Sequence, residues 1–575
     1  MKKMLLGDFA IARGAYEAGV HVATAYPGTP STEITEELSR FPEVNSEWAP
    51  NEKVAMEVAI GSAIHGARTI VGMKHVGLNV AADPLFTVAY TGINAGLVVC
   101  VADDPSMFSS QNEQDTRLIA RAANVPVIEP SDSQECKDFA ELAFELSEKY
   151  DTPVILRVTT RVAHSQSLVE IGERKEVPVK PYVKDIGKYV MMPANAKKRH
   201  LVVEDRLKRL AADSNGFSIN RIEKRSADLG IICAGGVYNY VREALPDASI
   251  LKLGMVYPLP LDLVKEFVSS VKRCIVIEEL EGHIEGLLKA NGISNVEGKN
   301  IFGIQGEFSV NLIKEKILGV KSEVSVAQIP ARPPVLCAGC PHRGVFYTLN
   351  KMKVSVMGDI GCYTLGAVPP LCAIEATVCM GASIGMAVGA EKADPAFAKN
   401  TVAVIGDSTF IHSGLTGIVE AVYNHSNITV IILDNRTTGM TGHQNNPANG
   451  KDIHNNPTYE VDLEKVCRSL GVPSVTVVDP YDLAAMEKAV KEELNKEGVS
   501  VIISKRPCVL LTKKLYKGFV VTDKCKKCKA CMKLGCPAIS FTENGAKIDT
   551  SLCTECGLCQ SVCKFGAIEK IEEVK

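Results

Sequence analysis

The segment TVAVIGDSTFIHSGLTGIVEAVYNHSNITVIILDN, residues 401–435, decides the fold class. Its two apolar runs, Val402 to Ile405 and Ile428 to Leu433, predict buried strands, and Gly417 to Tyr423 predicts a helix between them. Asp407 and Asn435 stand just past the carboxyl ends of these strands, where open α/β sheets bind their ligands. Because Mg²⁺ prefers carboxylate and amide oxygens, the two residues are candidate magnesium ligands.

Length and composition indicate that the whole chain is a multidomain α/β protein. A chain of 575 residues predicts several domains, and a net charge of −3 gives no sign of nucleic-acid or anionic-membrane binding. No apolar run approaches the roughly 18 residues of a membrane span. The first apolar stretch is broken at Gly7 and Asp8, so we expect no signal peptide and a cytoplasmic, reducing location. In a reducing compartment cysteines bind metals more often than they form disulfides.

Eight of the 19 cysteines lie in a short tail that contains CKKCKACMKLGCP (525–537) and CTECGLCQSVCKFG (553–566). Each run has a C-x2-C-x2-C core, as in bacterial ferredoxins with two clusters, where the fourth ligand comes from the other run. Zinc ribbons, the alternative, would use separated C-x2-C pairs. The tail resembles such a ferredoxin except that four residues separate Cys531 from Cys536, so we expect a bulge there and an unusual potential or easy loss of iron. The predicted [4Fe–4S] ligand sets are Cys525, Cys528, Cys531 and Cys563, and Cys536, Cys553, Cys556 and Cys559.

The N-terminal region contains two further motifs. In NEKVAMEVAIGSAIHGA (51–67), Glu52 precedes Gly61 by nine residues, a spacing that resembles the pyrimidine-binding domains of thiamine diphosphate (TPP) enzymes. The resemblance gives Glu52 the role of polarising N1′ of the cofactor, with Glu57 as a competing candidate in poorer register. YPGTPST (26–32) resembles a segment of pyruvate:ferredoxin oxidoreductases, which implies a contact between Thr29 and the substrate carboxylate. Equally, Ser31 is a candidate cap of the next helix.

These pieces, in this order, resemble the 2-oxoacid:ferredoxin oxidoreductase superfamily over nearly the whole chain, and most closely the alpha subunits of indolepyruvate ferredoxin oxidoreductases. Further matching segments are KHVGLNVAADPL (74–85), CAGCPHR (337–343), GDIGCYTLG (358–366) and DNRTTGMTGHQ (434–444). The diphosphate motif, Gly406-Asp407-Ser408 with Asn435, has Ser408 in place of glycine and Asp434 in place of a first asparagine. The resemblance implies TPP, with Mg²⁺ held by Asp407, Asn435 and the main-chain carbonyl of Thr437.

The resemblance also implies a reaction. An aryl 2-oxoacid, indolepyruvate foremost, would be oxidatively decarboxylated with coenzyme A to indoleacetyl-CoA and CO2, through a TPP ylide and iron–sulfur clusters that reduce ferredoxin. That chemistry belongs to anaerobic aromatic amino acid catabolism. No fifth α/β unit is evident, so we expect a separate, smaller gamma-type (beta) subunit. Pyruvate or branched-chain 2-oxoacids are the alternative substrates. A non-oxidative TPP decarboxylase would have no use for the tail, and a catalytically dead electron-transfer subunit would not need Glu52, Asp407 and Asn435.

A third, proximal [4Fe–4S] cluster is a further prediction. The order of Cys337, Cys340, Cys362 and Cys508 resembles that of the proximal ligands of pyruvate:ferredoxin oxidoreductases. Buried cysteines are common, however, Cys372 and Cys379 lie nearby, and the flanking His342 and Arg343 instead suit a substrate or phosphate contact.

Motifs and composition together predict four domains. These are a pyrimidine-binding domain (1–175), a domain resembling the transketolase C-terminal domain (200–320), a diphosphate-binding domain (335–512) and a ferredoxin module of the α+β class (517–575). A Lys- and Pro-rich connector (173–200) follows the first domain, and a Pro-rich linker, IPARPPVL (329–336), precedes the third.

Overall fold

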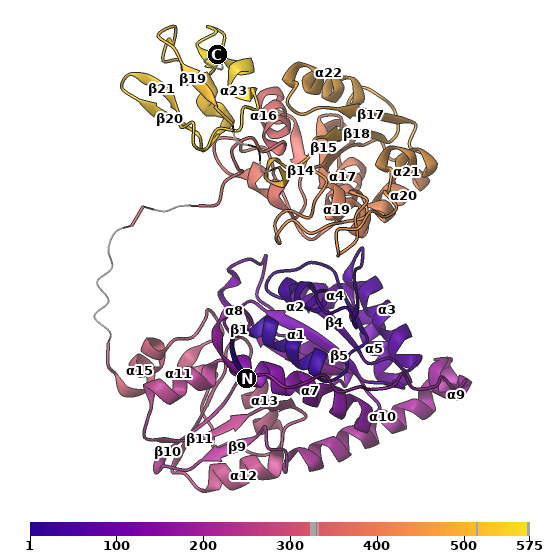
Figure 1. Cartoon of the computed structure of the whole chain (residues 1–575), viewed down its shortest axis with the longest axis vertical. Coiled ribbons are helices and arrows are strands. Elements are labelled where there is room, and N and C mark those ends of the chain that lie inside the picture. Colours follow the sequence, from indigo (N-terminus) through magenta and orange to yellow (C-terminus); the bar gives the residue numbers. More distant parts are fainter. Residues whose placement is uncertain (322–328, 331–332, 513, 515, 572–575) are drawn as a thin grey trace. The chain divides into compact units, whose positions relative to one another are not determined.

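The computed structural model describes residues 1–321, 329–330, 333–512, 514 and 516–571, so the linker prediction lies partly outside the described residues. The chain divides into two compact units, residues 1–327 and 328–575 (Figure 1). Both contain mainly parallel sheets with helices, the α/β class that the sequence predicts. Within the described ranges, every helix is too short or too polar to span a bilayer.

The first unit centres on a sheet whose described strands run in the order β12-β6-β7-β5-β4-β2-β3. Neighbours are parallel except at one edge, where β12 pairs antiparallel with β6. The middle strands β4, β5 and β7 are buried along their whole length, as expected when helices cover both faces. The strands are β2 Val22–Ala25, β3 Asn45–Trp48, β4 Thr69–Lys74, β5 Leu97–Asp103, β6 Val127–Ile128, β7 Val154–Thr159 and β12 Met255–Tyr257.

Several helices of this unit begin where a strand ends, which places their first residues at the carboxyl edge of the sheet. The helix α3 is capped by Asn51, whose side chain accepts a 2.9 Å hydrogen bond from the Val54 amide. The helices used below are α1 Gly7–Glu17, α2 Thr32–Leu38, α3 Glu52–Ile64, α4 His75–Val80, α5 Ala82–Thr91, α6 Thr116–Ala123, α7 Ser133–Tyr150 and α8 Thr160–His164.

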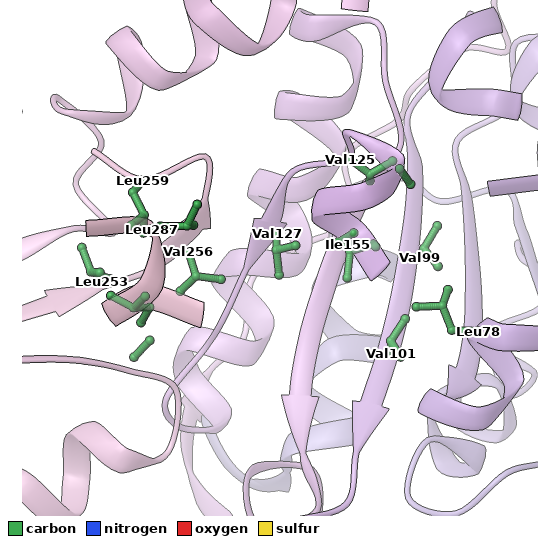
Figure 2. Close-up of a cluster of buried hydrophobic side chains, with 14 of the residues drawn as sticks. Leu78, Val99, Val101, Val125, Val127, Ile155, Leu253, Val256, Leu259 and Leu287 are labelled. Carbon is green, nitrogen blue, oxygen red and sulfur yellow. The ribbon is translucent and has the colours of Figure 1, made fainter. Parts of the chain in front are cut away.

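The predicted second domain forms a smaller sheet in the order β13-β10-β11-β9. Its strands are β9 Arg221–Glu223, β10 Ser226–Ala234, β11 Ala248–Leu253 and β13 Arg273–Ile277. The predicted connector is partly helical, because α10 (Pro193–Ser214) begins within it. The strand β12, which follows β11 in the chain, joins the first sheet. One apolar cluster therefore contains side chains of both regions, such as Val99 and Ile155 with Leu253 and Val256 (Figure 2).

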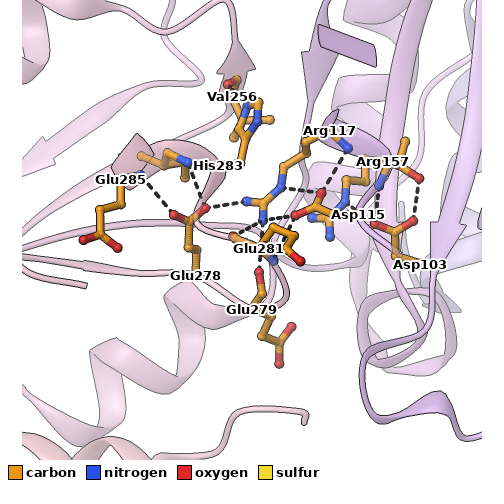
Figure 3. A network of polar contacts seen from close by, with 12 residues as sticks. Asp103, Asp115, Arg117, Arg157, Val256, Glu278, Glu279, Glu281, His283 and Glu285 are labelled. Carbon is orange, nitrogen blue, oxygen red and sulfur yellow. Dashed lines mark hydrogen bonds and ion pairs between the residues drawn. The ribbon is translucent and has the colours of Figure 1, made fainter. Parts of the chain in front are cut away.

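A buried charge network also links the two regions (Figure 3). The Arg117 guanidinium pairs with Asp115 at 2.6 Å and with Glu278, which follows β13, at 2.9 Å. Arg157 pairs with Asp103 at 2.7 Å and with Glu129 at 2.8 Å. Buried charges are tolerated only when they are paired in this way.

The second unit contains a parallel sheet in the order β14-β15-β16-β18-β17. The helices α16 and α22 pack on one face of it, and α17, α20 and α21 on the other. A single helix was predicted over 417–423; the structure has α20 there, preceded by a π-helical turn, Phe410–Gly414. The elements are β14 Ser355–Met357, β15 Thr401–Gly406, β16 Thr429–Asp434, β17 Ser474–Val478, β18 Ser500–Lys505, α16 His342–Met352, α17 Ala382–Ala393, α20 Leu415–Tyr423, α21 Leu463–Ser469 and α22 Leu483–Glu493.

The tail forms two small antiparallel ribbons and one short helix within this second unit. Between Cys531 and Cys536 the chain forms the end of a 3₁₀ turn, Ala530–Leu534, which is followed by Gly535 with a φ of 62°. This turn packs on the diphosphate region, since the Arg343 guanidinium donates to the Leu534 carbonyl at 2.6 Å. The elements are β19 Phe519–Val521, β20 Ile539–Thr542, β21 Gly545–Ile548, α23 Leu558–Val562 and β22 Ile568–Lys570.

Candidate cofactor sites

Three oxygen-bearing groups meet at the carboxyl edge of the second unit's sheet, where β15 and β16 end side by side. One end of the Asn435 side-chain amide lies 3.2 Å from Asp407 Oδ1 and 2.8 Å from the Thr437 carbonyl oxygen. With the amide nitrogen at that end, Asn435 donates to both oxygens; with the amide oxygen there, three acceptor groups meet. Buried acceptors need a partner, and a hard cation such as Mg²⁺ takes this oxygen set. The residues present therefore fit the predicted magnesium.

A histidine supports that orientation of the amide. Asn435 Nδ2 lies 3.3 Å from Nε2 of His342, at the start of α16. Burial lowers the pKa of His342 to about 4, so the ring is neutral and Nε2 is able to accept a hydrogen bond. In the tautomer whose Nε2 carries no hydrogen, the ring accepts from the amide nitrogen, and the amide oxygen points to Asp407. Sequence reasoning had connected His342 only with a substrate or phosphate contact.

The Asp407 carboxyl has an unusual electrostatic setting. Its oxygens accept backbone hydrogen bonds from Ser408 at 2.8 Å and from Arg436 at 2.9 Å. Burial, and then the charge of Asp434, nevertheless raise the pKa of Asp407 to about 8. A cation at the oxygen site would reverse both effects, because it stabilises the ionised form. Ser408 adds a hydroxyl to this edge, and Thr438 donates to it at 3.0 Å.

The four proximal cysteines gather beside this oxygen site. Burial, and then the charges of Cys508 and Cys337, raise the pKa of Cys362 to about 11. Burial is the main cause that raises the pKa of Cys340 to about 12; the His342 backbone and the Arg343 charge oppose the rise, and the charges of Cys337 and Cys362 add to it. The Cys508 amide donates to the Asn435 carbonyl at 2.9 Å, so this cysteine directly adjoins a candidate magnesium ligand. The thiols of three separated segments therefore lie near enough to act on one another's pKa values, and the proximal cluster remains a prediction.

The C-x2-C loop of this set also contacts the tail. Gly339 has a φ of 68°, and a Cβ on it would overlap the Thr554 hydroxyl, which lies between Cys553 and Cys556. The nearby cysteines Cys372 and Cys379 are exposed and do not appear among the charges that shift the pKa values of the four thiols.

The eight tail cysteines line two apolar cavities, four in each. Apolar side chains such as Phe519 and Leu558 complete one cavity, and Val521 and Phe541 the other. Gly339 and Arg343 of the diphosphate region line the first cavity too. An apolar pocket with four converging thiols fits a cubane cluster. The two sets are Cys536, Cys553, Cys556 and Cys559, and Cys525, Cys528, Cys531 and Cys563.

Glu52 is the first residue of α3 in the first unit and is 5% exposed. The partial positive charge of the helix N-terminus favours a carboxylate at this place. Gly77 of α4 packs so closely that a Cβ there would lie 2.6 Å from Glu52 Oε1. The competing Glu57 is about half exposed and pairs with Lys53 on the same helix, so its side chain lies at the protein surface.

Thr29 lies in the turn between β2 and α2 with a half-buried side chain. The prediction that Ser31 caps α2 through its side chain is wrong: its hydroxyl donates to the Gly28 carbonyl at 2.8 Å and closes the turn. Sequence reasoning missed Lys74, whose Cβ would lie 3.2 Å from a Cβ on Gly28. Burial lowers the pKa of Lys74 to about 8, and its ammonium donates to the Ser109 carbonyl at 2.6 Å.

Comparison with known proteins identifies the domain types in which these residues lie. Residues 13–205 match the family model for the pyruvate flavodoxin/ferredoxin oxidoreductase thiamine diphosphate-binding domain. Residues 359–504 match the C-terminal TPP-binding domain of thiamine pyrophosphate enzymes, and residues 546–569 match a 4Fe-4S binding domain.

Curated relatives extend the similarity to the whole chain. It is 40% identical to the indolepyruvate oxidoreductase subunit IorA of Archaeoglobus fulgidus, over 99% of this chain and 97% of the relative. It is 41% identical to IorA of Pyrococcus horikoshii, over 100% of this chain and 97% of the relative. A 2-oxoglutarate synthase subunit KorA of Methanocaldococcus jannaschii is 27% identical over 49% of this chain and 89% of its own. On this evidence the chain belongs to the IorA family of indolepyruvate oxidoreductase subunits, within the 2-oxoacid:ferredoxin oxidoreductases.

Proposed function

We propose that this subunit oxidatively decarboxylates aryl 2-oxoacids, indolepyruvate foremost, to the acyl-CoA and CO2, and passes the electrons to ferredoxin. The observation that carries the proposal lies in the second unit. There a backbone hydrogen bond joins Cys508 to Asn435 of the magnesium-type oxygen set, and Gly339 adjoins Thr554, which stands between two cysteines of one tail quartet. A smaller beta subunit, coenzyme A and an external ferredoxin complete the proposed system.

The binding roles follow from the side chains. Asp407, Asn435 and the Thr437 carbonyl would hold Mg²⁺ and, through it, the cofactor diphosphate. When bound, thiamine diphosphate supplies the electron sink for decarboxylation. Glu52 would hold the proton shared with N1′ of the aminopyrimidine. Lys74 would attract the carboxylate of the substrate towards Thr29, because a cation at this turn complements an anionic substrate.

The proposed electron path begins at Cys337, Cys340, Cys362 and Cys508. It continues to the quartet that includes Cys553 and Cys556, because the Gly339 backbone touches the loop between these two residues. The quartet that includes Cys525 comes last. A non-oxidative decarboxylase would need none of these steps, so the thiol sets favour the oxidative reaction.

Iron analysis tests the proximal cluster. Full-length, anaerobically prepared protein should contain about twelve irons per chain, and Cys508→Ser about eight, since each cubane holds about four. The control Cys372→Ser removes an exposed neighbouring thiol and should keep about twelve. A wild-type chain with about eight irons would leave the tail as the whole path.

Activity tests the substrate. The complex with its smaller subunit, assayed without oxygen on a panel of 2-oxoacids, should show a higher kcat/KM for indolepyruvate than for pyruvate. A higher kcat/KM for pyruvate or branched-chain 2-oxoacids would instead make those acids the substrates of the enzyme. Release of aldehyde without reduction of the acceptor would contradict the oxidative reaction itself.

A further inference from the structure

One buried carboxylate of the first unit lies outside all the sites described above. Asp8, in the first turn of α1, is 0% exposed. Neither of its oxygens has a hydrogen-bond partner among the residues that the structure describes. An ionised carboxylate is strongly destabilised in such a place unless a proton or a cation neutralises it.

Two more ligand groups converge on Asp8. One ligand atom each of Asp8, Glu33 and His164 lies within 4.8 Å of the other two. They come from α1, the first turn of α2 and the last residue of α8, which are far apart in the sequence. His164 Nε2 is 3.7 Å from Glu33 Oε1, too far for a hydrogen bond, and Glu33 Oε2 is also buried without a partner.

From this geometry we propose that Asp8, Glu33 and His164 bind a divalent transition-metal ion, with zinc as the ion to test first. Two carboxylates and a neutral imidazole carry a charge of −2, which a divalent cation balances. No lysine or arginine among the described residues forms an ion pair with either carboxylate, and a protonated His164 beside Glu33 would balance only one of the two charges. The imidazole nitrogen favours zinc and its neighbours over magnesium or calcium, which prefer oxygen ligands.

The site would have a structural role at a functional edge. Glu33 directly follows the turn of Thr29 and Ser31, and α8 begins with Thr160, whose hydroxyl donates to Asp104 at 2.8 Å. A metal bound to Asp8, Glu33 and His164 would therefore fix α2 to α8 on top of α1. The side chains of Glu33 and His164 are 31% and 35% exposed, so water has access to a fourth coordination position.

Zinc binding by the full-length chain with loaded clusters tests the proposal. After chelator treatment the protein is dialysed against zinc, and zinc per chain is counted for wild type, Asp8→Asn, Glu33→Gln and Glu36→Gln. The last variant is the control, on the same helix but outside the cluster. Wild type and Glu36→Gln should hold about one more zinc than the other two variants, as one three-residue site predicts. Zinc bound elsewhere is common to all four proteins and cancels.

Thermal unfolding gives the second measurement. Zinc should raise the Tm of wild type and of Glu36→Gln but not that of Asp8→Asn or Glu33→Gln, because a ligand stabilises the state that binds it. If Asp8→Asn does not fold, His164→Gln replaces it, since that side chain is partly exposed. Equal zinc contents and equal Tm shifts in all variants would overturn the proposal and leave a proton on Asp8.

Discussion

Asp103 and Asp407 occupy corresponding places in the two units but have opposite surroundings. Each stands at the carboxyl end of a buried parallel strand, β5 and β15 respectively. Asp103 is fully paired: Arg157 lies 2.7 Å away, and the Thr116 amide and hydroxyl donate to it at 3.1 and 2.5 Å. Asp407 faces the Asn435 amide and the Asp434 charge, and no lysine or arginine among the described residues pairs with it.

The difference separates structural charges from binding charges. The Asp103 end of its sheet belongs to the network of Figure 3, in which Asp103 and Asp115 are each paired with a guanidinium. Such a network has no capacity left for a ligand. At the Asp407 end, the Asn435 amide can also turn its oxygen toward Asp407, and a cation bound between the acceptor groups makes that orientation favourable. Position in an α/β sheet therefore indicates where a ligand can bind, and the pairing of the polar groups indicates whether one does.

The largest expected effect concerns Glu52, the carboxylate of the first unit that we assign to chemistry. Glu52→Gln should lower turnover by about 10²–10⁴, the usual loss when acid–base assistance is removed, with magnesium–TPP binding retained. Exchange of the C2 hydrogen of bound TPP with deuterium measures the step directly. Glu57→Gln, on the same helix but at the surface, should exchange like wild type. Wild-type exchange in Glu52→Gln would exclude this residue from the mechanism.

The next effect is a loss of stability, and it concerns the buried charge network of the first unit. Arg117→Met leaves Asp115 and Glu278 buried without their cation, which should cost about 3–5 kcal/mol. Trp48 of β3 is the single tryptophan, so its fluorescence during urea unfolding reports on the first unit. Lys272→Met, which removes an exposed partner of Asp228, should change the midpoint little. Loss of TPP binding with an unchanged midpoint would give Arg117 a binding role instead.

A substitution at Asp407 should instead weaken cofactor binding and leave stability unchanged. Asp407→Ala should weaken magnesium–TPP binding by at least about 100-fold, because a direct ligand matters at least as much as the groups that orient it. Calorimetry provides the affinity, and the urea midpoint should not fall, since a buried, uncompensated carboxyl is removed. Asp434→Asn, at the end of the neighbouring strand, should retain the cofactor. Unchanged affinity in Asp407→Ala would mean that the metal site lies elsewhere.

Sites built within one segment were predictable from sequence. The tail quartets follow from spacing, because a C-x2-C-x2-C loop can supply only neighbouring ligands, and the structure groups the thiols in the same two cavities. Asp407 and Asn435 were found because adjacent parallel strands end at the same edge. The approach of Cys508 to Cys362 was suggested by resemblance alone, since spacing does not bring segments almost 150 residues apart to one edge.

Other features depend on tertiary contacts that no local pattern contains. The hydroxyl of Ser31 bonds backwards to Gly28 because the turn closes on itself, although serine before a helix normally predicts a cap. The strand β12 leaves its own domain's sheet and joins the first one, so the two regions share a core. The group of Asp8, Glu33 and His164 spans three helices and has no sequence signature.

The smallest expected effect is a pH dependence of stability that arises from Asp407. In the metal-free protein, burial and Asp434 raise the pKa of Asp407 to about 8, well above its usual range. Between about pH 4 and 8 the folded chain therefore holds a proton that the unfolded chain has released. Through this group, the stability of the metal-free protein should fall as the pH rises across that window.

Magnesium binding should show the reverse trend, since the metal binds only the ionised carboxyl. Below about pH 8, Mg²⁺ must displace the proton of Asp407, so its apparent affinity should weaken by up to about tenfold for each pH unit. Calorimetric titrations at several pH values, with TPP present, give the curve. In Asp434→Asn the neighbouring negative charge is absent, the pKa of Asp407 should be lower, and the bend should move to lower pH. Titration of the cofactor's own phosphate is common to both proteins and cancels from the comparison. Identical curves for the two would show that Asp434 does not act on the metal ligand.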